Sequence, residues 1–374
     1  MRFTVSSTAL SSRLSTLSRV INSKNSIAIL DCFLFEVAGG QLEITASDSE
    51  NVMKTTLTLD EVEGEGSFAV NNRKILDAVK ELPEQPLTLD VNLEEMLIKV
   101  IYQNGIYNFT CQNAEEYPRT QQMGDQAATL QLPSQVLLDN ITRSIFATAN
   151  EELRPVMNGI YMDLTSDSLN IVASDGHKLV RNKYFALKSE QPRAFILQKK
   201  PATLLKNVLP KDESDVIIRF DDRNAEIAFG STLLACRLID GRYPNYNSVI
   251  PQDNPFQLSI DRKTLIGALR RVLPFASENS QQVRLRIEAG KIEVSSEDID
   301  FNTSAKEEVS CSYDGTPMSI GFKGPSLIEI LSNLDSDEVL LEFADPSRPC
   351  LVIPAEQPEG EEVLMLIMPM LLND

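Results

Sequence analysis

The apolar positions of the chain repeat the same order of elements three times. Each repeat begins with a short strand, followed by leucine, isoleucine or valine at spacings of three and four residues, which predicts an amphipathic helix. Two strands joined by a turn come next, then a strand, a second helix and more strands. We predict the six helices at residues 7–21, 71–82, 133–149, 198–211, 261–276 and 323–334.

The paired strands make the repetition visible in the residues themselves. Thr45-Ala-Ser-Asp48 in the first repeat matches Val172-Ala-Ser-Asp175 in the second, and residues 281–299 contain a third version. We expect the turns at Gly39-Gly40, Ser166-Asp167 and Ala289-Gly290. Because internal repetition indicates tandem units, we predict three domains, 1–125, 126–252 and 253–374. Two helices and alternating strands in each unit predict an α+β protein with extensive antiparallel sheet.

Length and composition agree with a multidomain protein of the cytoplasm. A chain of 374 residues exceeds one ordinary core, and its 42% hydrophobic and 24% charged residues are typical of globular proteins. No run of 18 apolar residues predicts a membrane helix, and the first residues do not resemble a secretory signal. The cysteines are widely scattered, which favours a reducing compartment over a disulfide framework: Cys32, Cys111, Cys236, Cys311 and Cys350.

The net charge of −19 argues against nucleic-acid binding when it is averaged over the chain, but its distribution reverses this reading. The six predicted helices carry 15 basic and 5 acidic residues, whereas the remainder carries 20 basic and 49 acidic residues. A solvated helix face is the simpler reading for any one helix. Helices sharing one surface would attract a polyanion there. Aromatic residues do not interleave with the basic ones, so contact with the nucleic-acid backbone is favoured over base recognition.

Candidate catalytic and metal-binding residues are few. Asp175 and His177 could form an acid–base pair, but no nucleophile motif accompanies them, and the matching segments of the other repeats lack histidine. A structural turn is therefore the default interpretation of all three segments. One histidine and dispersed cysteines do not form a metal ligand set. Without a phosphate-binding loop either, we predict no cofactor, no metal and no catalytic activity.

Four short motifs, in their order along the three repeats, resemble the bacterial DNA sliding clamp family, the beta subunit of DNA polymerase III. They are M-R-F-T-V at the N-terminus, S-D-G-H-K-L at 174–179, D-G-R-Y-P at 240–244 and M-P-M at 368–370. The resemblance implies a ring of two head-to-tail copies, with helices around the hole and sheets outside. Double-stranded DNA would pass through the hole without sequence readout, and the clamp would confer processivity on the replicative DNA polymerase.

The resemblance also implies a cleft between the second and third domains in which polymerases, the clamp loader and repair proteins dock short linear motifs. By position it comprises Met157, Ser174, Gly176, His177, Lys178, Leu179, Pro244, Ser248, Val249, Cys350, Leu366, Ile367, Met368, Pro369 and Met370. Met and Leu side chains suit a pocket that adapts to several partners. Pro369 disfavours a central strand, which leaves Met368 and Met370 to line a cleft.

The other residues implied by the resemblance bind DNA or the second copy. The DNA contacts map onto Lys24, Arg73, Arg154, Lys199, Lys200 and Lys323. The dimer interface maps onto Tyr107 and Phe109 of one copy and Pro274 and Phe275 of the other. The chain departs from the family pattern at Pro155-Val156, where paired tyrosines are usual, and at Glu151, which replaces a glutamine. Leu371 replaces an arginine, which predicts a more apolar cleft edge.

Two other classes of function remain open at this point. An acidic scaffold or ligand-binding repeat protein would not be retained on DNA of any form. An enzyme built around Asp175 and His177 would lose turnover on His177→Ala. A DNA-encircling ring would instead be retained on closed circular DNA in a salt-sensitive way and lost on linearisation.

Overall fold

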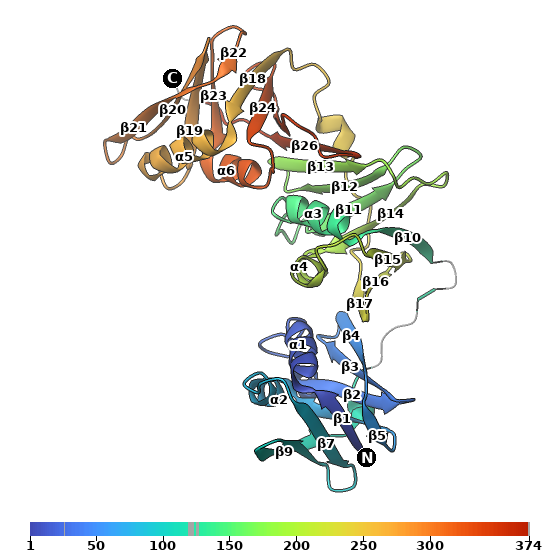
Figure 1. Cartoon of the computed structure of the whole chain (residues 1–374). Coiled ribbons are helices and arrows are strands. Elements are labelled where there is room, and N and C mark those ends of the chain that lie inside the picture. The colour runs from blue at the N-terminus through green and yellow to red at the C-terminus, as the bar shows by residue number, and fades with distance from the viewer. Residues whose placement is uncertain (26, 119–122, 125–126, 373–374) are drawn as a thin grey trace. The chain divides into compact units, whose positions relative to one another are not determined.

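The computed structural model describes residues 1–374 apart from 26, 119–122, 125–126 and 373–374 (Figure 1). The predicted boundary between residues 125 and 126 lies outside the described residues. The first repeat contains β1 (Arg2–Ser6), α1 (Ser7–Ser18), β2 (Cys32–Ala38), β3 (Gln41–Ser47), β4 (Asn51–Thr58), β5 (Glu61–Glu63), β6 (Gly66–Asn71), α2 (Asn72–Val79), β7 (Pro86–Asn92), β8 (Leu97–Tyr102) and β9 (Gly105–Gln112).

The other two repeats follow the same order. The second contains β10 (Ala128–Pro133), α3 (Ser134–Ile145), β11 (Gly159–Leu164), β12 (Leu169–Ser174), β13 (Lys178–Tyr184), β14 (Arg193–Gln198), α4 (Lys199–Val208), β15 (Asp215–Phe220), β16 (Asn224–Phe229) and β17 (Thr232–Arg237). The third contains β18 (Phe256–Asp261), α5 (Arg262–Val272), β19 (Gln282–Glu288), β20 (Lys291–Asp298), β21 (Thr303–Ser310), β22 (Ser312–Tyr313), β23 (Met318–Lys323), α6 (Gly324–Ser332), β24 (Glu338–Phe343), β25 (Cys350–Pro354) and β26 (Glu361–Ile367).

All six predicted helices are present, and each ends before its predicted last residue. In α1 the leucines at 10, 14 and 17 are fully buried, as their spacing predicts. The helix nevertheless ends at Ser18, because the backbone tightens there and the Arg19 amide donates to the carbonyls of Leu17 and Thr16. At the N-termini of α1, α2 and α5 the side chains of Ser6, Asn71 and Asp261 each accept a hydrogen bond from the main-chain N–H three residues further along the chain.

The chain packs as two compact units, Met1–Leu138 with Thr203–Leu238, and Asp139–Ala202 with Ile239–Asp374. The first unit contains one sheet of 13 strands, in which β17 of the second repeat pairs with β4 of the first. The second unit contains a sheet of nine strands, in which β13 of the second repeat pairs with β26 of the third, and a sheet of four strands. All the pairings are antiparallel, which confirms the predicted α+β class with antiparallel sheets.

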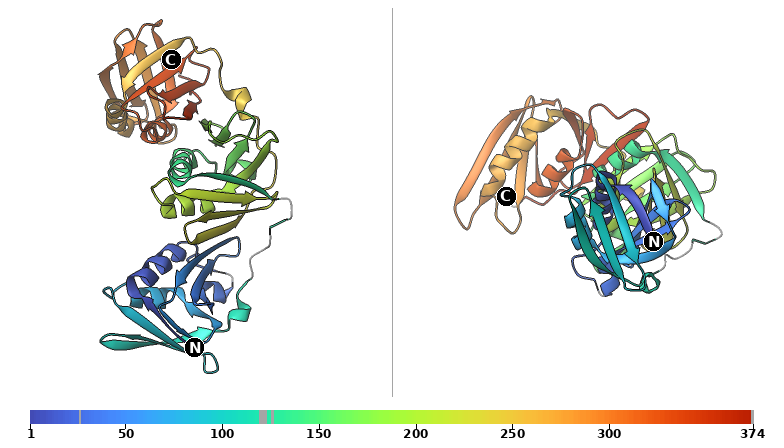
Figure 2. Two further views of the ribbon diagram at one scale, coloured as in Figure 1. Left: turned by 45° about the vertical axis from the view of Figure 1, so that its right-hand side comes forward. Right: turned by 60° about the horizontal axis from the view of Figure 1, so that its bottom comes forward.

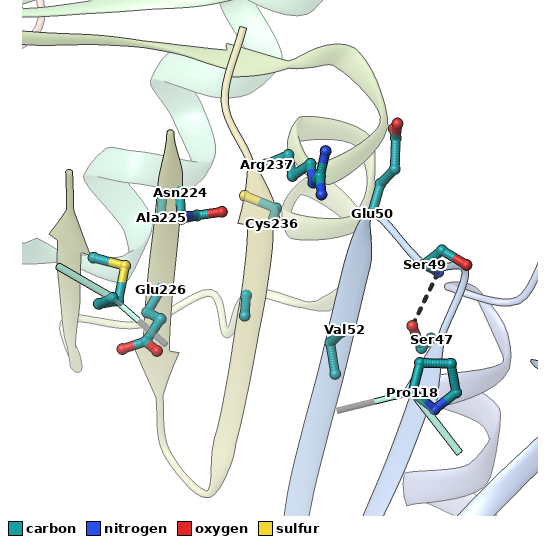
Figure 3. A pocket seen from close by; sticks show the side chains of 12 residues that line it. Ser47, Ser49, Glu50, Val52, Pro118, Asn224, Ala225, Glu226, Cys236 and Arg237 are labelled. Atoms are coloured by element: carbon teal, nitrogen blue, oxygen red, sulfur yellow. Dashed lines mark hydrogen bonds between the residues drawn. The ribbon is translucent and has the colours of Figure 1, made fainter. Parts of the chain in front are cut away.

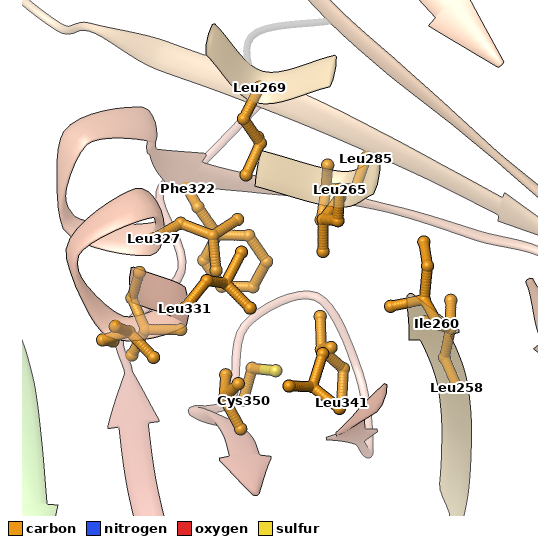
Figure 4. Close-up of a cluster of buried hydrophobic side chains, with 14 of the residues drawn as sticks. Leu258, Ile260, Leu265, Leu269, Leu285, Phe322, Leu327, Leu331, Leu341 and Cys350 are labelled. Atoms are coloured by element: carbon orange, nitrogen blue, oxygen red, sulfur yellow. The ribbon is translucent and has the colours of Figure 1, made fainter. Parts of the chain in front are cut away.

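The core of the third repeat lies where α5 and α6 pack against the strands (Figures 1 and 2). Figure 4 shows the helix residues Leu265, Leu269, Leu327 and Leu331 meeting strand residues such as Leu341. These leucines are fully buried. The cluster also includes Val180 and Ala173 of the second repeat, so the two repeats share one core within this unit.

Candidate functional site

Strands β13 and β26 form the seam between the second and third repeats, and their two faces bury different apolar clusters. Leu179 and Leu366 lie directly opposite each other in the antiparallel pair. Both belong to a small cluster on one face, with Val172, Ile196, Tyr243, Tyr246, Ile250, Leu351 and Leu364. Val180 and Ile367 alternate with them and join the helix core on the opposite face.

A segment after β17 covers part of the small cluster. Tyr243 stacks on Tyr161 with ring centroids 4.6 Å apart and an interplanar angle of 1°. The Tyr246 hydroxyl donates to Asp163 Oδ2 at 2.7 Å, and burial together with this carboxylate raises the pKa of Tyr246. The same segment exposes Pro244, Ser248 and Val249, and Val249 is 50% exposed. The D-G-R-Y-P motif pointed to this segment in the sequence, whereas no motif or spacing predicted that Tyr161 would stack on it.

The turn from Ser174 to Lys178 lies at the end of the same strands and presents His177. Asp175 Oδ1 accepts the main-chain N–H groups of His177 and Lys178, both at 2.9 Å. Gly176 takes a φ of 90°, which favours glycine. Asp175 therefore builds the turn, as the default interpretation expected. The imidazole of His177 is exposed, and its carbonyl accepts the Met368 amide at 2.8 Å.

The C-terminal residues continue from β26 beside this turn. Met368 is 38% exposed and Leu371 is 84% exposed, while Pro369 and Met370 are half-buried. Met370 forms an antiparallel bridge with Gly321 of β23. Strand β26 thus ends at Ile367, before the proline, and the methionines that follow lie outside its regular pairing. The tail follows Leu366 of the small cluster in the chain and bonds to the turn that presents His177. The small cluster, this turn and the apolar tail together form what we call the candidate peptide site.

Three residues expected at this site by position have side chains that face away from it. Cys350 and Ile367 are buried in the helix core, and burial raises the pKa of the Cys350 thiol well above its usual value. The Lys178 side chain reaches to α6 on the helix face. Met157, at the end of the short 3-10 helix Pro155–Met157, is only 5% exposed, and its place at this site stays a prediction. Strand alternation accounts for the first three, because matching a motif by position does not distinguish the two faces of a strand.

Four of the six basic residues expected to bind DNA, Arg73, Lys199, Lys200 and Lys323, lie at the start of the second helix of a repeat. Arg73 of α2 lines a cavity of about 490 Å³ with Ser18, Ile21, Asn22, Ser23, Asp31, Asn71, Asn72 and Leu76. Lys199 and Lys200 of α4 line a cavity of about 300 Å³ with Ala149, Asn150, Pro155, Asn158, Gln198 and Ile239. Lys323 caps α6 and is exposed, as is Lys24 in the loop after α1. Helix N-termini and exposed cations favour phosphate at these positions.

Arg154 differs from this group, because its charge is already paired. Its guanidinium meets Glu151 in a two-bond ion pair, with the closest atoms 2.9 Å apart. A Cβ at Gly176 would lie 3.2 Å from Arg154 Nη1, so the guanidinium packs against the turn that presents His177. The structure therefore brings Arg154 to the candidate peptide site.

Several other basic residues of the helices also have partners. Arg143 of α3 is buried and bonds to Glu361 and Asp335, at 2.6 Å and 3.2 Å. Lys263 pairs with Asp337, and Arg271 pairs with Glu307. Counting charges along the sequence thus overstated the positive charge that the helices offer to a ligand.

The residues expected at the dimer interface lie on exposed edges. Tyr107 on β9 contacts the rings of Tyr102 and Phe109, at centroid distances of 4.8 Å and 6.4 Å. Strand β9 pairs with β6 only at Cys111 and Gln112, so the edge of residues 105–110 is open in the described part of the chain. In the other unit Pro274 is exposed and Phe275 is 40% exposed.

The seam between the first and second repeats has a pocket of its own. It has a volume of about 100 Å³ and lies at the β4–β17 seam (Figure 3). Ser47, Ser49 and Glu50 line it from the first repeat, and Cys236 and Arg237 line it from the second. These positions match the turn and tail of the candidate peptide site, with Glu50 at the position of His177 and Arg237 at the position of Met368.

Comparison with known proteins identifies one family over nearly the whole chain. Models of the DNA polymerase III beta subunit match its N-terminal domain at residues 1–121, its central domain at 131–245 and its C-terminal domain at 247–371. The beta sliding clamp of Pseudomonas putida is 27% identical over 368 residues, which cover 98% of this chain and 99% of that protein.

Solved structures agree with this match along the full length. A sliding clamp of Bartonella birtlesii bound to griselimycin is 25% identical, with a TM-score of 0.91 and complete coverage of both chains. A sliding clamp of Pseudomonas aeruginosa, also bound to griselimycin, has the same fold at 24% identity, with a TM-score of 0.94 and complete coverage. Among the described residues, no helix is long and apolar enough to span a membrane.

Proposed function

We propose a function from the premise that this chain belongs to the DNA polymerase III beta subunit family, whose three domain models match it in order. It is a DNA sliding clamp. Two copies form a ring that encircles double-stranded DNA and tethers the replicative polymerase and other proteins, which makes synthesis processive. The subunit is non-catalytic.

The observation that carries this function is that the resemblance to sliding clamps extends along nearly the whole chain. Relatives named beta sliding clamp align with 98% of the chain, and the solved clamps superimpose over all of it. We place the three domains at 1–125, 126–252 and 253–374, within a few residues of the family models. Sheets that continue across each seam explain why packing alone divides the chain into two units rather than three.

We assign partner peptides to the candidate peptide site. Support comes from the small apolar cluster under Leu179 and Leu366, from the exposed Val249, and from the tail at Met368. Flexible methionines beside a rigid apolar floor suit several different apolar peptides. Leu371 extends the apolar edge by a further exposed side chain.

We assign DNA contact to Lys24, Arg73, Lys199, Lys200 and Lys323. Arg73 at the start of α2, and Lys199 and Lys200 at the start of α4, lie beside open cavities where phosphate oxygens would meet both a cation and main-chain N–H groups. Lys323 stands at the N-cap position of α6, and Lys24 is exposed in the loop after α1. Arg154 would have to leave Glu151 to contribute. A few screened phosphate contacts without base contacts would allow the ring to slide.

We assign ring closure to Tyr107 and Phe109 of one copy and Pro274 and Phe275 of the other. The open strand edge beside the half-buried Tyr107 and Phe109, and the exposed side chain of Phe275, are unfavourable on an isolated monomer, and burial against a second copy removes both. Strand β21, which pairs only with β20 among the described strands, supplies a second edge in the other unit. Two different patches on one chain make a head-to-tail contact, which closes as a ring.

We also assign the protein to the cytoplasm. The five cysteines are free thiols, and burial raises the pKa of Cys32 to about 11, so that thiol is unreactive at neutral pH. Unpaired cysteines are typical of proteins kept in a reducing compartment.

Retention on circular DNA tests the sliding function. The purified protein, loaded on closed circular DNA, should remain bound during gel filtration and be released when a nuclease linearises the circle. Light scattering should give a mass near twice 41.6 kDa. Retention that is unchanged by linearisation would mean tight local binding, and a monomer at all concentrations would exclude the ring.

A further inference from the structure

Lys178 is a buried cation at the candidate peptide site, and its side chain points away from that site. It is only 8% exposed. Its neighbour Leu179 faces the small cluster, whereas Val180 faces the helix core, so strand alternation places Lys178 on the helix face. A lysine at such a position needs a partner, because an unpaired buried ammonium is strongly unfavourable.

Three groups surround the ammonium of Lys178. The Lys178 Nζ donates a hydrogen bond to Glu329 Oε2 of α6 at 2.8 Å, and it lies 3.3 Å from Asp175 Oδ2. The Nζ also lies 5.6 Å from the centre of the Phe146 ring, within cation–π range. The lysine thus joins the second-repeat turn to a helix of the third repeat through charge-assisted contacts in a largely buried setting.

The turn held by Lys178 connects two parts of the candidate peptide site, the exposed His177 and the apolar tail that begins at Met368. Asp175 uses one oxygen for the His177 and Lys178 amides and the other for the Lys178 ammonium. The His177 carbonyl in turn accepts the Met368 amide at 2.8 Å. A shift of this turn would therefore move both His177 and the start of the apolar tail.

Glu329 provides a rigid anchor for this arrangement. Its helix α6 is fixed by Leu327 and Leu331, which are fully buried in the core (Figure 4). Ile330 of the same helix is also fully buried there. The side chain of Glu329 itself is 49% exposed and extends to Lys178 from the helix surface. A side chain carried by a helix that is packed in the core can set the position of a turn more narrowly than contacts within the turn itself.

We propose that Glu329 is a positioning residue for partner binding: through Lys178 it fixes the turn from Ser174 to Lys178, and thereby His177 and Met368. Glu329 acts through Lys178 and the turn, and it does not contact the partner. This inference rests on the proposed function, in which an apolar peptide occupies the candidate peptide site.

The test uses the full-length protein, with griselimycin as the probe because two related clamps have been crystallised with it. Calorimetry should show that Glu329→Ala weakens binding about tenfold, which corresponds to about 1.4 kcal/mol. Glu329→Gln keeps an oxygen acceptor for the ammonium, so its affinity for griselimycin should lie between those of wild type and Glu329→Ala. The matched control is Asp337→Asn, which removes an exposed partner of Lys263 on the same repeat and should leave the affinity unchanged.

A second readout separates positioning from general loss of structure. His177 is the only histidine in the chain, so its imidazole proton signals need no assignment. They should shift or broaden in Glu329→Ala but not in Asp337→Asn. In a Lys178→Met background the further change Glu329→Ala should have no added effect on affinity or on these signals.

The possible failures are distinguishable. If wild type does not bind griselimycin, or Met368→Ala binds it as well as wild type, the assignment of the candidate peptide site is wrong. If wild type binds, Met368→Ala weakens binding and Glu329→Ala changes neither the affinity nor the His177 signals, only the positioning role is overturned. Additive effects of Lys178→Met and Glu329→Ala would also overturn it.

Discussion

The two seams between repeats use the same backbone arrangement and different side chains. In the first seam Asn51 lies opposite Cys236, and in the second Lys178 lies opposite Ile367. Asp48 Oδ1 accepts the amides of Glu50 and Asn51, as Asp175 Oδ1 accepts those of His177 and Lys178. The turn is therefore built in the same way in both repeats.

The difference begins at the residue that ends the turn. Asn51 is 2% exposed, and its side-chain amide donates to both oxygens of Asp48, at 3.2 Å and 3.0 Å. It thus bonds within its own turn, whereas Lys178 is long enough to reach Glu329 on another repeat. One longer side chain changes a local turn into a contact between domains.

The same contrast extends along the strands. Across the first seam, Thr232 and Thr55 place their hydroxyls 3.4 Å apart, and Met53 lies opposite Leu234. The second seam is crossed by charged contacts, in which Arg143 meets Glu361 and Glu362 meets both Arg181 and Lys183. The comparison indicates that the exposed apolar side chains at the second seam are accompanied by ion pairs between its two repeats.

The largest expected effect is the loss of the buried pair at the second seam. Arg143→Leu leaves Glu361, whose side chain is 7% exposed, without its cation. Removing one member of a buried pair typically costs about 3 kcal/mol or more in the free energy of unfolding. Urea unfolding followed by circular dichroism measures this loss. The exposed pair offers a control, because Lys263→Met should cost well under about 1 kcal/mol, and equal losses would show that burial does not matter here.

The next effect tests which seam binds a ligand. Met368→Ala should weaken griselimycin binding about tenfold, because it removes an exposed apolar side chain from the proposed site. Arg237 holds the matching position in the first seam, one residue beyond the Cys236–Asn51 pair, and Arg237→Ala should leave binding unchanged. Calorimetry measures both. If only Arg237→Ala weakened griselimycin binding, the peptide site would have to be assigned to the first seam instead.

The sequence predicted the elements of both seams and little of what distinguishes them. Spacing of apolar residues located all six helices, because a buried helix face repeats along the chain. The turns were located by their glycine and Ser-Asp residues. The predicted helices extend beyond the observed ones at their C-terminal ends, since a local signal cannot show where tertiary packing stops.

The contacts across the second seam could not be predicted. Glu329 lies 151 residues from Lys178 in the sequence, and no period or motif connects them. Arg143 was counted with the basic residues available to DNA, but it is buried against two carboxylates. Whether a cation faces a ligand or an internal partner is decided by the fold, which a charge count does not contain.

A smaller effect follows from the third turn position, which is Ser49 in the first seam and Gly176 in the second. Both have positive φ, 81° and 90°. Ser49→Gly should raise the free energy of unfolding by up to about 1 kcal/mol, because glycine adopts this conformation without strain. Gly176→Ala should lower it by a similar amount or more, since a Cβ would lie 3.2 Å from Arg154 Nη1. Thermal unfolding of both variants measures the two changes in the free energy of unfolding. Changes of the same sign would contradict the expectation that glycine is the favoured residue at this position in both seams.

The smallest expected effect is a pH dependence confined to the second seam. Burial raises the pKa of Glu362, but the hydrogen bond from Lys183 and the charges of Arg181 and Lys183 outweigh burial and lower it overall from its usual 4.5. A carboxyl group whose pKa is lower in the folded state stabilises that state above its unfolded pKa. This contribution is lost as the pH falls through the folded value. Because Glu362 is 37% exposed, we expect it to be under about 1 kcal/mol.

Urea midpoints measured at neutral pH and at several values below 4.5 test this contribution. Other carboxyl groups titrate in the same range, so the difference between wild type and Glu362→Gln is the quantity to follow. That difference should be present at neutral pH and close to zero in acid. The matching change in the first seam, Thr232→Val, removes a hydroxyl that does not titrate, so its cost should be the same at every pH. A difference for Glu362→Gln that grows on acidification would show that burial, rather than the two cations, determines the charge state of this glutamate.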